Sequence, residues 1–435
     1  RSSAASDVYK RQVKIITKNE EDCGMTVLSE QDKIRLLADI VKIQTENDHE
    51  IEVCEYLKDL LSQYDIDSKI VKVNDSRANL VAEIGSGAPV LAISGHMDVV
   101  DAGDHDDWTF PPFELTDKDG KLFGRGTTDM KGGLMAMVIA MIELKQSNAL
   151  KQGTIRLLAT TGEETEQYGA QLLADEGYLD DVSGLIIGEP TSNIAYYAHK
   201  GSMSCVVTAK GKAAHSSMPH LGTNAVDILV DFVNEMKQEY KNIKEHDKVH
   251  ELDAVPMIEK HLHRKIGEEE SHIYSGFVML NSVFNGGKQV NSVPHKATAK
   301  YNVRTVPEYD STFVKDLFEK VIRHVGEDYL TVDIPSSHDP VASDRDNPLI
   351  QNITRIAPNY VHEDIVVSAL IGTTDASSFL GTNENNVDFA VFGPGESIMA
   401  HQVDEFIRKD MYLSYIDVYK DVFKACLLYT SPSPR

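Results

Sequence analysis

The chain has 435 residues, of which 41 % are hydrophobic and 26 % are charged, and its formal net charge is -25 at pH 7. This composition is typical of a globular protein long enough for two domains, and the acidic charge excludes nucleic acid and anionic membrane as partners because both require a basic surface. No apolar run reaches the roughly 18 residues of a membrane helix and no leader pattern is present, so we expect a cytoplasmic protein. The four cysteines are scattered, so any metal should be held by His, Asp and Glu.

Both ends of the chain resemble read-through of a sequencing adaptor. A single oligonucleotide, read on opposite strands, encodes DVYKRQ at residues 7–12 and CLLYTS at residues 426–431. We therefore expect residues 1–24 to be a disordered leader that derives from the adaptor or from untranslated sequence, with Met25 as the natural start. Residues 426–435 are expected to be a disordered adaptor-derived tail.

Helical and β-rich segments alternate through the first half of the chain. We expect helices around Ile34–Val41 and Val53–Leu61, strands at SKIVKV, ANLVAEI and PVLAISGH, an apolar helix at GGLMAMVIAMIELKQ, a strand at TIRLLAT, a helix at YGAQLLADEGY and a strand at GLIIGE. Strands that alternate with helices predict an α/β domain with a mixed, mostly parallel sheet covered by helices on both faces.

The pattern changes near Lys200. The segment GSMSCVVTAKGKAAHSSMP, the helix NAVDILVDFVNEMKQ, a polar stretch, and the segments SGFVMLNSVFNGG and HKATAKYNVRTV predict a small α+β module inserted into the larger domain. We place this module at residues 200–310. The larger domain then comprises residues 25–199 and 311–425, and it ends with the helix YLSYIDVYKDVFKA.

Acidic and imidazole side chains follow several of the predicted strands. His96 and Asp98 close one strand, Asp129 lies in the Gly-rich turn GRGTTDMKGG, Glu163 and Glu164 follow LLATTG, Glu189 follows GLIIG, and His401 follows FGPGESIMA. Sites in an α/β sheet assemble at the carboxyl ends of its strands, so these side chains should meet at one edge. Each motif alone has an ordinary structural explanation, as a helix cap, a turn or a hydrogen-bonded histidine. Their joint occurrence favours a metal centre.

The residue types suit a pair of divalent ions. Imidazole and carboxylate form the ligand set of catalytic zinc sites, and one carboxylate can bridge two ions about 3.5 to 4 Å apart. Asp129 is the natural bridge, which leaves His96 with one further carboxylate and His401 with another. Adjacent side chains of an extended segment point in opposite directions, so one of Glu163 and Glu164 should bind metal while the other takes a proton from water.

Three other candidates are weaker. The Asp-rich segment DAGDHDDW (residues 101–108) follows a strand and is expected to be a solvated loop, and HLHRK (residues 261–265) is expected to be a surface helix or loop. A phosphate-binding function for GRGTTDMKGG is disfavoured because the turn lacks the Gly-Lys-Ser/Thr ending of a P-loop.

Motifs in eight places resemble, in order and spacing, the acetylornithine deacetylase and succinyl-diaminopimelate desuccinylase family of dizinc amidohydrolases. They are SGHMDVV, GRGTTDMKGG, GEE, GEPT, GKAAHSSMPHLGTNA, NGGKQVNSVP with YNVR, GTTDASSF, and FGPGESIMAHQVDE. The resemblance covers residues 25–425 and is strongest to the Gram-positive succinyl-diaminopimelate desuccinylases. It implies a zinc-exopeptidase-like catalytic domain with an inserted ferredoxin-like dimerisation or lid domain, and a homodimer formed through that inserted domain.

The resemblance also implies a site with two Zn²⁺ ions per subunit, for which Co²⁺ or Mn²⁺ could substitute. One ion would be held by His96, Asp129 and Glu189, and the other by Asp129, Glu164 and His401. Glu163 would then be the general base. Asp98 would orient His96 by accepting the other N–H of its imidazole ring.

Further residues match the substrate-binding positions of the family. His215 would reach the active site of the partner subunit, and Arg304 would bind the substrate carboxylate with its two-pronged guanidinium. The positions that match hydrogen-bonding residues are Asn285, Gly372, Thr373 and Thr374. The chain departs from the family at two places: Lys200 stands where some desuccinylases have arginine, and Glu396 stands near a position that is otherwise asparagine.

The implied reaction is metal-dependent hydrolysis of a small N-acyl amino acid. N-succinyl-LL-2,6-diaminopimelate would react with water to give succinate and LL-2,6-diaminopimelate, a step in lysine and cell-wall precursor synthesis. The alternatives are acetylornithine deacetylation, dipeptidase or aminoacylase chemistry, and a non-catalytic metal-binding homologue of the same fold.

Overall fold

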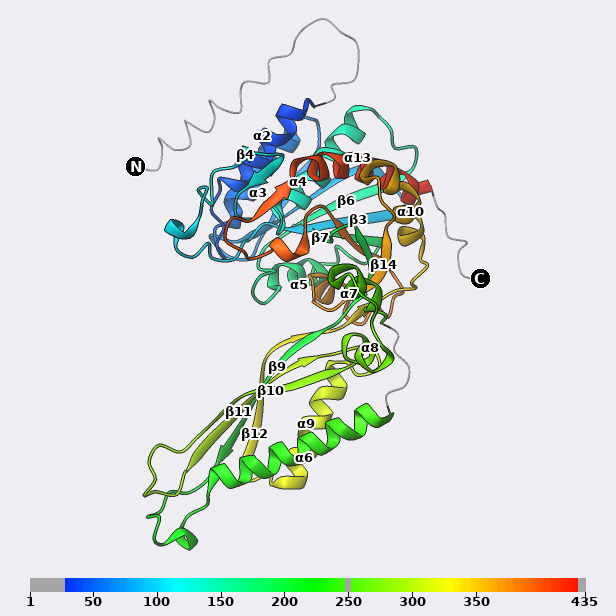
Figure 1. Cartoon of the computed structure of the whole chain (residues 1–435). Coiled ribbons are helices and arrows are strands. Elements are labelled where there is room, and N and C mark those ends of the chain that lie inside the picture. Colours follow the sequence, from blue (N-terminus) through cyan, green and yellow to red (C-terminus); the bar gives the residue numbers. More distant parts are fainter. Residues whose placement is uncertain (1–27, 247–251, 429–435) are drawn as a thin grey trace, which may run out of the picture.

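A computed structural model describes residues 28–246 and 252–428, in which a smaller module projects from a larger α/β body (Figure 1). The predicted leader at 1–24 and residues 429–435 of the predicted tail lie outside the described residues. The expectation of disorder for the first residues of the tail is wrong. Helix α13 (Lys409–Leu428) continues through them and buries Leu427, which is 2 % exposed and packs in the core. Among the described helices, none has the length and apolarity needed to cross a bilayer.

The larger body is built on a mixed sheet. Its strands lie in the order β1-β2-β6-β3-β7-β15-β8-β13, with β14 also paired to β8. They are β1 (Ser68–Lys72), β2 (Ala78–Ser86), β3 (Val90–His96), β6 (Gly153–Thr160), β7 (Val182–Pro190), β8 (Ile194–His199), β13 (Val341–Ala342), β14 (Val366–Leu370) and β15 (Asp388–Gly393). The central strands β6, β3, β7 and β15 are parallel, which directs their carboxyl ends to one edge.

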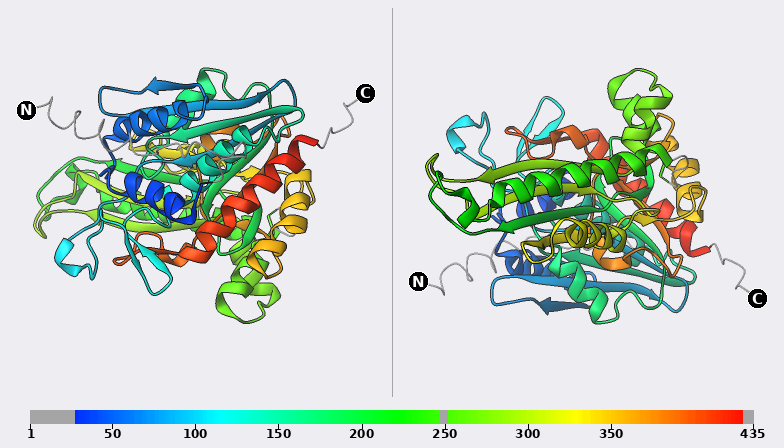
Figure 2. Two further views of the ribbon diagram at one scale, coloured as in Figure 1. Left: turned by 90° about the horizontal axis from the view of Figure 1, so that it is seen from above. Right: turned by 90° about the horizontal axis from the view of Figure 1, so that it is seen from below.

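Both faces of this sheet are buried, as predicted, because alternate residues of a strand point to opposite sides. Leu91 and Ile93 of β3 pack in one core cluster, whereas Val90 and Ala92 pack in another. The first layer contains α2 (Glu30–Val41), α3 (Glu50–Ser62), α4 (Lys131–Gln146), α10 (Pro348–Ile356), α11 (Pro358–Val361) and α13 (Figure 2). The second contains α5 (Tyr168–Asp175), α7 (Val255–Leu262) and α12 (Ala376–Leu380).

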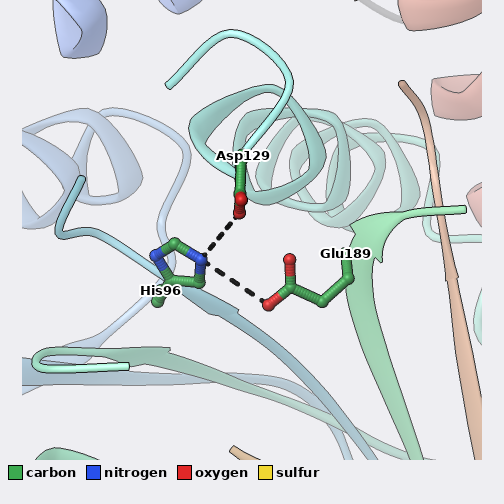
Figure 3. A group of neighbouring side chains, drawn as sticks. All are labelled: His96, Asp129 and Glu189. Atoms are coloured by element: carbon green, nitrogen blue, oxygen red, sulfur yellow. Dashed lines mark hydrogen bonds and ion pairs between the residues drawn. The ribbon is translucent and has the colours of Figure 1, made fainter. Parts of the chain in front are cut away.

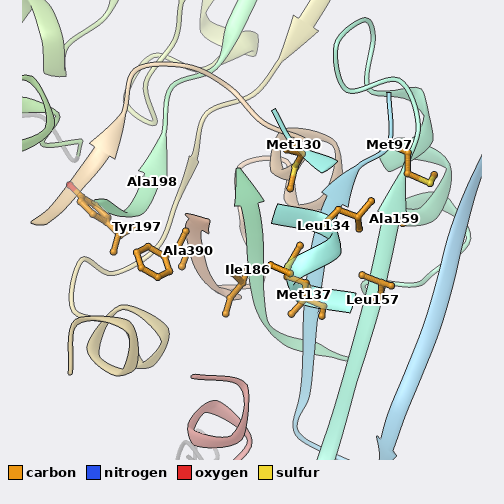
Figure 4. Packing of buried hydrophobic residues seen from close by; sticks show 14 of the residues in the cluster. Met97, Met130, Leu134, Met137, Leu157, Ala159, Ile186, Tyr197, Ala198 and Ala390 are labelled. Atoms are coloured by element: carbon orange, nitrogen blue, oxygen red, sulfur yellow. The ribbon is translucent and has the colours of Figure 1, made fainter. Parts of the chain in front are cut away.

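Helix α4 is apolar on all sides because it is enclosed between the sheet and α13. Its residues Leu134 and Met137 lie against Leu157 of β6 and Ile186 of β7 (Figure 4). The helix starts two residues after Asp129, so its packing fixes the position of the turn that carries this carboxylate.

The projecting module has an antiparallel sheet of order β10-β11-β9-β12. Its elements are β9 (Ser202–Lys210), η2 (Pro219–Leu221), α6 (Ala225–His246), β10 (Val278–Gly286), β11 (Lys296–Arg304), α9 (Ser311–Val325) and β12 (Leu330–His338). The chain order and strand order are those of a ferredoxin-like fold. The predicted end of the module at residue 310 is therefore wrong, because β12 pairs with β9 and α9 packs on α6. Periodicity shows that a helix and a strand follow, but not which sheet the strand joins.

In the polar stretch between α6 and β10, residues of helix α7 (Val255–Leu262) pack on the larger body rather than on the module. Helix α7 lies against β14, and α8 (Glu268–Ser275) follows it (Figure 1). The amide of Ala369 in β14 donates to the carbonyl of Asp253, 2.8 Å away. The segment that leads into α7 therefore covers an otherwise open edge of β14.

A small third sheet lies beside the large one. It consists of β4 (Thr116–Lys118), β5 (Lys121–Phe123) and β16 (Phe406–Arg408), with β16 and β5 antiparallel. The short helices η1 (His105–Asp107) and η3 (Ser397–Met399) lie in the loops before β4 and before β16. Through this sheet, the segment after His401 is paired with the segment that leads to Asp129.

Candidate metal centre

The predicted strand-end residues meet at one edge of the large sheet. His96 is the last residue of β3, Glu163 and Glu164 follow β6, Glu189 is next to last in β7, and His401 lies beyond β15. Asp129 reaches the same edge from the turn before α4. The parallel arrangement of β3, β6, β7 and β15 brings together residues that are as far apart in the chain as His96 and His401.

His96, Asp129 and Glu189 form the first group of possible metal ligands (Figure 3). The Nε2 atom of His96 lies 3.2 Å from Oδ1 of Asp129 and 3.6 Å from Oε1 of Glu189. The His96 side chain is 1 % exposed, and the carboxylates of Asp129 and Glu189 are each 13 % exposed. One imidazole nitrogen thus faces two carboxylate oxygens in a nearly buried pocket.

Asp129, Glu164 and His401 form the second group. Nε2 of His401 lies 3.3 Å from Oδ2 of Asp129 and 3.1 Å from Oε1 of Glu164. The two oxygens of Asp129 therefore face different histidines, as a bridging carboxylate requires. The His401 side chain is 52 % exposed, so this group is the more open of the two.

The donor set fits divalent cations. Burial raises the pKa of Glu189, and the neighbouring Asp129 and Glu164 raise it further, although His96 lowers it. The same two effects, burial and nearby carboxylates, raise the pKa of Glu164. Several acidic groups thus share one poorly hydrated site, where a bound cation would stabilise their ionised forms. In each group, the ligand atoms lie within 4.8 Å of one another, which is compatible with a single ion between them.

Glu163 is close to the groups but belongs to neither. Residues 163–166 form a turn rather than the extended segment assumed above, and only Glu164 contacts His401. Burial raises the pKa of Glu163 well above its ordinary value, and nearby Glu189 and Asp375 add to the rise while His96 opposes it. A carboxylate with a raised pKa beside a metal pocket suits a group that accepts a proton and later returns it.

Asp98 has a different partner from the one expected. Nδ1 of His96 lies 2.9 Å from the main-chain carbonyl of Asp98, whereas the nearest carboxylate oxygen is 3.6 Å away. Because a carbonyl only accepts, Nδ1 carries the proton, and in the neutral ring Nε2 is then free for a metal. The carboxylate instead accepts the amides of Gly162, Glu163 and Glu164 at 3.0, 3.2 and 3.0 Å. Asp98 thus orients the turn that carries Glu163 through its carboxylate, and it orients His96 through its main-chain carbonyl.

None of the predicted substrate-binding residues belongs to either ligand group found in the described part of the chain. Asn285 is exposed on β10, and Arg304 is half-buried at the end of β11. His215 is exposed in the loop after β9, where its Nδ1 lies 2.8 Å from Oγ of Ser217. Lys200 is 3 % exposed, and its ammonium donates to the carbonyl of Gly276 at 2.6 Å. This hydrogen bond fixes the C-terminal end of α8, because Gly276 is the C-cap of that helix.

The residues Gly372, Thr373 and Thr374 form the loop between β14 and α12. The next residue, Asp375, was not predicted as a site residue. It is 2 % exposed, and its Oδ2 accepts a hydrogen bond from Oγ1 of Thr160 at 2.6 Å. Burial raises its pKa to about 7. A carboxylate just after a strand end and a turn was the signal that could have identified it.

Two further residues beside Asp129 were also missed. Lys131 is fully buried, and its ammonium donates to the carbonyls of Ile43 and Ile40 at 2.7 and 3.1 Å. Glu405, four residues after His401, is fully buried against the turn that carries Asp129. In contrast, neither ligand group found in the described residues includes a residue of 101–108 or 261–265.

We expect the affinity of the metal-free protein for divalent ions to increase with pH. Hydrogen bonds with Asp129 and Glu164 raise the pKa of His401 to about 10, so this imidazole is protonated at neutral pH and must lose its proton to bind metal. Calorimetric zinc titrations between about pH 6 and about pH 8, in buffers of different ionisation enthalpy, measure this proton release. A metal affinity that does not change with pH would contradict the prediction.

The raised pKa of His401 also affects the stability of the protein in the absence of metal. Because the pKa of His401 is raised on folding, its ion pairs stabilise the metal-free fold fully below the unfolded value near 6.5, and this contribution is lost as the pH rises through about 10. The melting temperature of the metal-free protein should therefore decrease across this range. Bound metal should remove this dependence, since it replaces the proton.

Comparisons with known proteins agree with this geometry. Residues 92–425 match the model of peptidase family M20/M25/M40. Over 398 residues, the chain is 61 % identical to a probable succinyl-diaminopimelate desuccinylase of Staphylococcus aureus, which covers 91 % of this chain and 98 % of that protein. It is 29 % identical to an acetylornithine deacetylase of Vibrio parahaemolyticus, over 82 % of this chain and 87 % of that one. An M20 family metallo-carboxypeptidase of Sulfolobus solfataricus has a similar fold, with a TM-score of 0.72, 19 % identity, and coverage of 92 % and 100 %.

Proposed function

The chain belongs to peptidase family M20/M25/M40, and on this basis we propose that it is a metal-dependent hydrolase that converts N-succinyl-LL-2,6-diaminopimelate and water to succinate and LL-2,6-diaminopimelate. The reaction type rests on the two ligand groups that share Asp129. The choice of substrate rests on the identity to the staphylococcal protein, which extends over nearly the full length of both chains.

We assign His96, Asp129 and Glu189 to one zinc ion, and Asp129, Glu164 and His401 to the other. Bound zinc would polarise the amide carbonyl and acidify water. Glu163 takes the proton from the attacking water, and it then delivers that proton to the nitrogen of the leaving amine. Asp98 holds the Glu163 amide at 3.2 Å, which fixes the base relative to the ligands. Cleavage of the amide C–N bond yields a carboxylate and an amine.

The substrate is an anion, and the protein has a net charge of -25, so binding requires local cations. Within residues 28–246 and 252–428, no hydrogen bond or ion pair engages the guanidinium of Arg304. Burial lowers its pKa, so a partner anion would offset the cost of its desolvation. These features support a role for Arg304 in binding a substrate carboxylate. We also propose that Asn285 and the loop of Gly372, Thr373 and Thr374 supply neutral hydrogen bonds.

A panel of substrates tests the proposal. The zinc-loaded protein would be assayed with N-succinyl-LL-2,6-diaminopimelate, acetylornithine and simple dipeptides, with release of the amine as the common readout. We expect the succinyl substrate to be hydrolysed with the highest kcat/KM, a chelator to abolish the activity, and zinc or cobalt to restore it. Preference for acetylornithine or a dipeptide would replace the substrate assignment. Absence of hydrolysis with all three would indicate a non-catalytic homologue.

We further propose that the protein is a homodimer formed through the projecting module. Strand β10 lies at the edge of its sheet, and its residues Leu280 and Phe284 are 59 % and 42 % exposed. Val230 on the neighbouring α6 is 41 % exposed. An open strand edge with apolar side chains is a natural surface for pairing with a second copy. In such a dimer, His215 would act at the active site of the other subunit.

Mixing two inactive variants tests this assignment of His215. Glu163→Gln and His215→Ala are each expected to lose activity, but a mixed dimer contains one site with both residues intact. Random exchange of subunits should then restore roughly a quarter of the wild-type activity. A mixture of Glu163→Gln with Glu164→Ala serves as the control, because both changes fall in the same site and no intact site can form. No recovery in the first mixture would place His215 in its own subunit's site or outside catalysis.

A further inference from the structure

The carboxylate of Glu405 is fully buried at the base of the turn that carries Asp129. Its Oε1 accepts the main-chain amides of Thr128 and Asp129 at 2.8 and 3.0 Å. Its Oε2 accepts the amide of Gly126 at 3.0 Å and Nη1 of Arg125 at 2.6 Å. Four donors of one turn thus converge on a single carboxylate, which satisfies a charge that would otherwise be costly to bury.

Glu405 also belongs to the segment that carries the other histidine. It lies four residues after His401, and further contacts pair its segment with the Asp129 turn. The amide of Gly124 donates to the carbonyl of Glu405 at 2.9 Å, and Oγ1 of Thr128 donates to the carbonyl of Phe406 at 2.6 Å. A displacement of Glu405 would therefore move Asp129 and His401 relative to each other.

A carboxylate suits this position better than any other side chain. All four of its partners are donors, so each of the two oxygens must accept. An amide of the same shape would keep one oxygen but would turn an NH₂ group toward a main-chain amide or the guanidinium, where two donors face each other. The side chain of Arg125 is only 2 % exposed. Replacing the Glu405 carboxylate with an amide would therefore leave the buried Arg125 guanidinium without an anion.

We propose that Glu405 is a positioning residue for the metal pair: it fixes the bridging Asp129 against His401 without contacting the ions or the substrate. This inference rests on the proposed function, because it assumes that Asp129 and His401 bind metal. According to this inference, the Glu405 carboxylate sets the distance between Asp129 and His401, two ligands of the more open group. Loss of this carboxylate should weaken metal binding in a protein that is still folded.

The test compares Glu405→Gln with Asp404→Asn. The control makes the same chemical change one residue earlier, where Oδ1 of Asp404 accepts the amide of Thr109 at 2.7 Å and not an amide of the Asp129 turn. Zinc would be titrated into the metal-free proteins by calorimetry, and the visible absorption of the cobalt-loaded proteins would report the ligand geometry. We expect at least one binding step of Glu405→Gln to weaken by roughly 10- to 100-fold, with an altered cobalt spectrum. The control should keep both steps and the spectrum.

The outcomes separate this inference from its premise. If the wild type binds two ions and Glu405→Gln binds them equally well with an unaltered cobalt spectrum, Glu405 is only a stabilising residue and the inference is wrong. If the wild type binds no divalent ion, the proposed function fails first and the inference fails with it. Should Glu405→Gln not fold, Glu405→Asp decides, because it keeps the charge but withdraws the carboxylate. A folded Glu405→Asp with wild-type metal affinity would overturn the inference, and weakened affinity would support it.

Discussion

Replacement of Glu163 by Gln is expected to reduce kcat by roughly 10²- to 10⁴-fold, the usual contribution of a general base, and to leave two metal ions bound per subunit. The amide of Gln keeps the size of the side chain but cannot take a proton from water. Metal content should persist because Glu163 belongs to neither ligand group. Steady-state kinetics and elemental analysis of the same preparation measure the two quantities.

A matched control for this variant lies in the same turn. Glu166 is exposed and belongs to neither ligand group, so Glu166→Gln should keep both kcat and metal content. Loss of metal in Glu163→Gln would instead make Glu163 a ligand, and the roles of Glu163 and Glu164 would have to be exchanged. Undiminished turnover would remove Glu163 from the mechanism altogether.

Replacement of Asp129 by Asn should have the broadest effect, because Asp129 is shared by both ligand groups. Its two oxygens lie 3.2 Å from Nε2 of His96 and 3.3 Å from Nε2 of His401. Asn supplies one oxygen and no charge, so it cannot bridge two cations. We expect fewer than two ions per subunit and a loss of activity beyond the roughly 10- to 100-fold cost that is typical when only a supporting residue of a metal site is removed.

The control for this variant is Asp106→Asn in the Asp-rich loop. Asp106 is exposed in η1, and neither ligand group includes it. The Asp106→Asn variant should therefore retain full metal content and activity. Elemental analysis and zinc titration of the two variants decide the matter, and two tightly bound ions in Asp129→Asn would contradict the bridging role.

Much of the metal centre could be predicted from the sequence. Apolar runs that end in His96, Glu189 or the Glu163–Glu164 pair identify strands whose carboxyl ends meet in a parallel sheet, and the structure brings these residues together as expected. Local pattern carries this information because strand direction and the order of helices and strands determine the edge at which each strand ends.

Partners of buried polar groups could not be predicted in the same way. The family resemblance implied a hydrogen bond between His96 and the Asp98 carboxylate, but that carboxylate accepts amides of residues 162–164 instead. Glu405 accepts amides from residues 276 to 279 positions away in the chain. Such contacts depend on how loops pack on one another, and no periodicity in either segment encodes them.

The sequence by itself determined the α/β class, the existence of an inserted module and the residues that could bind metal, because these follow from local periodicity and side-chain chemistry. Only the tertiary structure decided that α9 and β12 belong to that module and that α7 packs on the larger body. It also showed that one carboxylate, Glu405, joins the Asp129 turn to the His401 segment. The physical reason is that a strand edge and a buried charge find their partners among residues that are distant in the chain. The packing of the whole fold decides which of the possible partners each of them contacts.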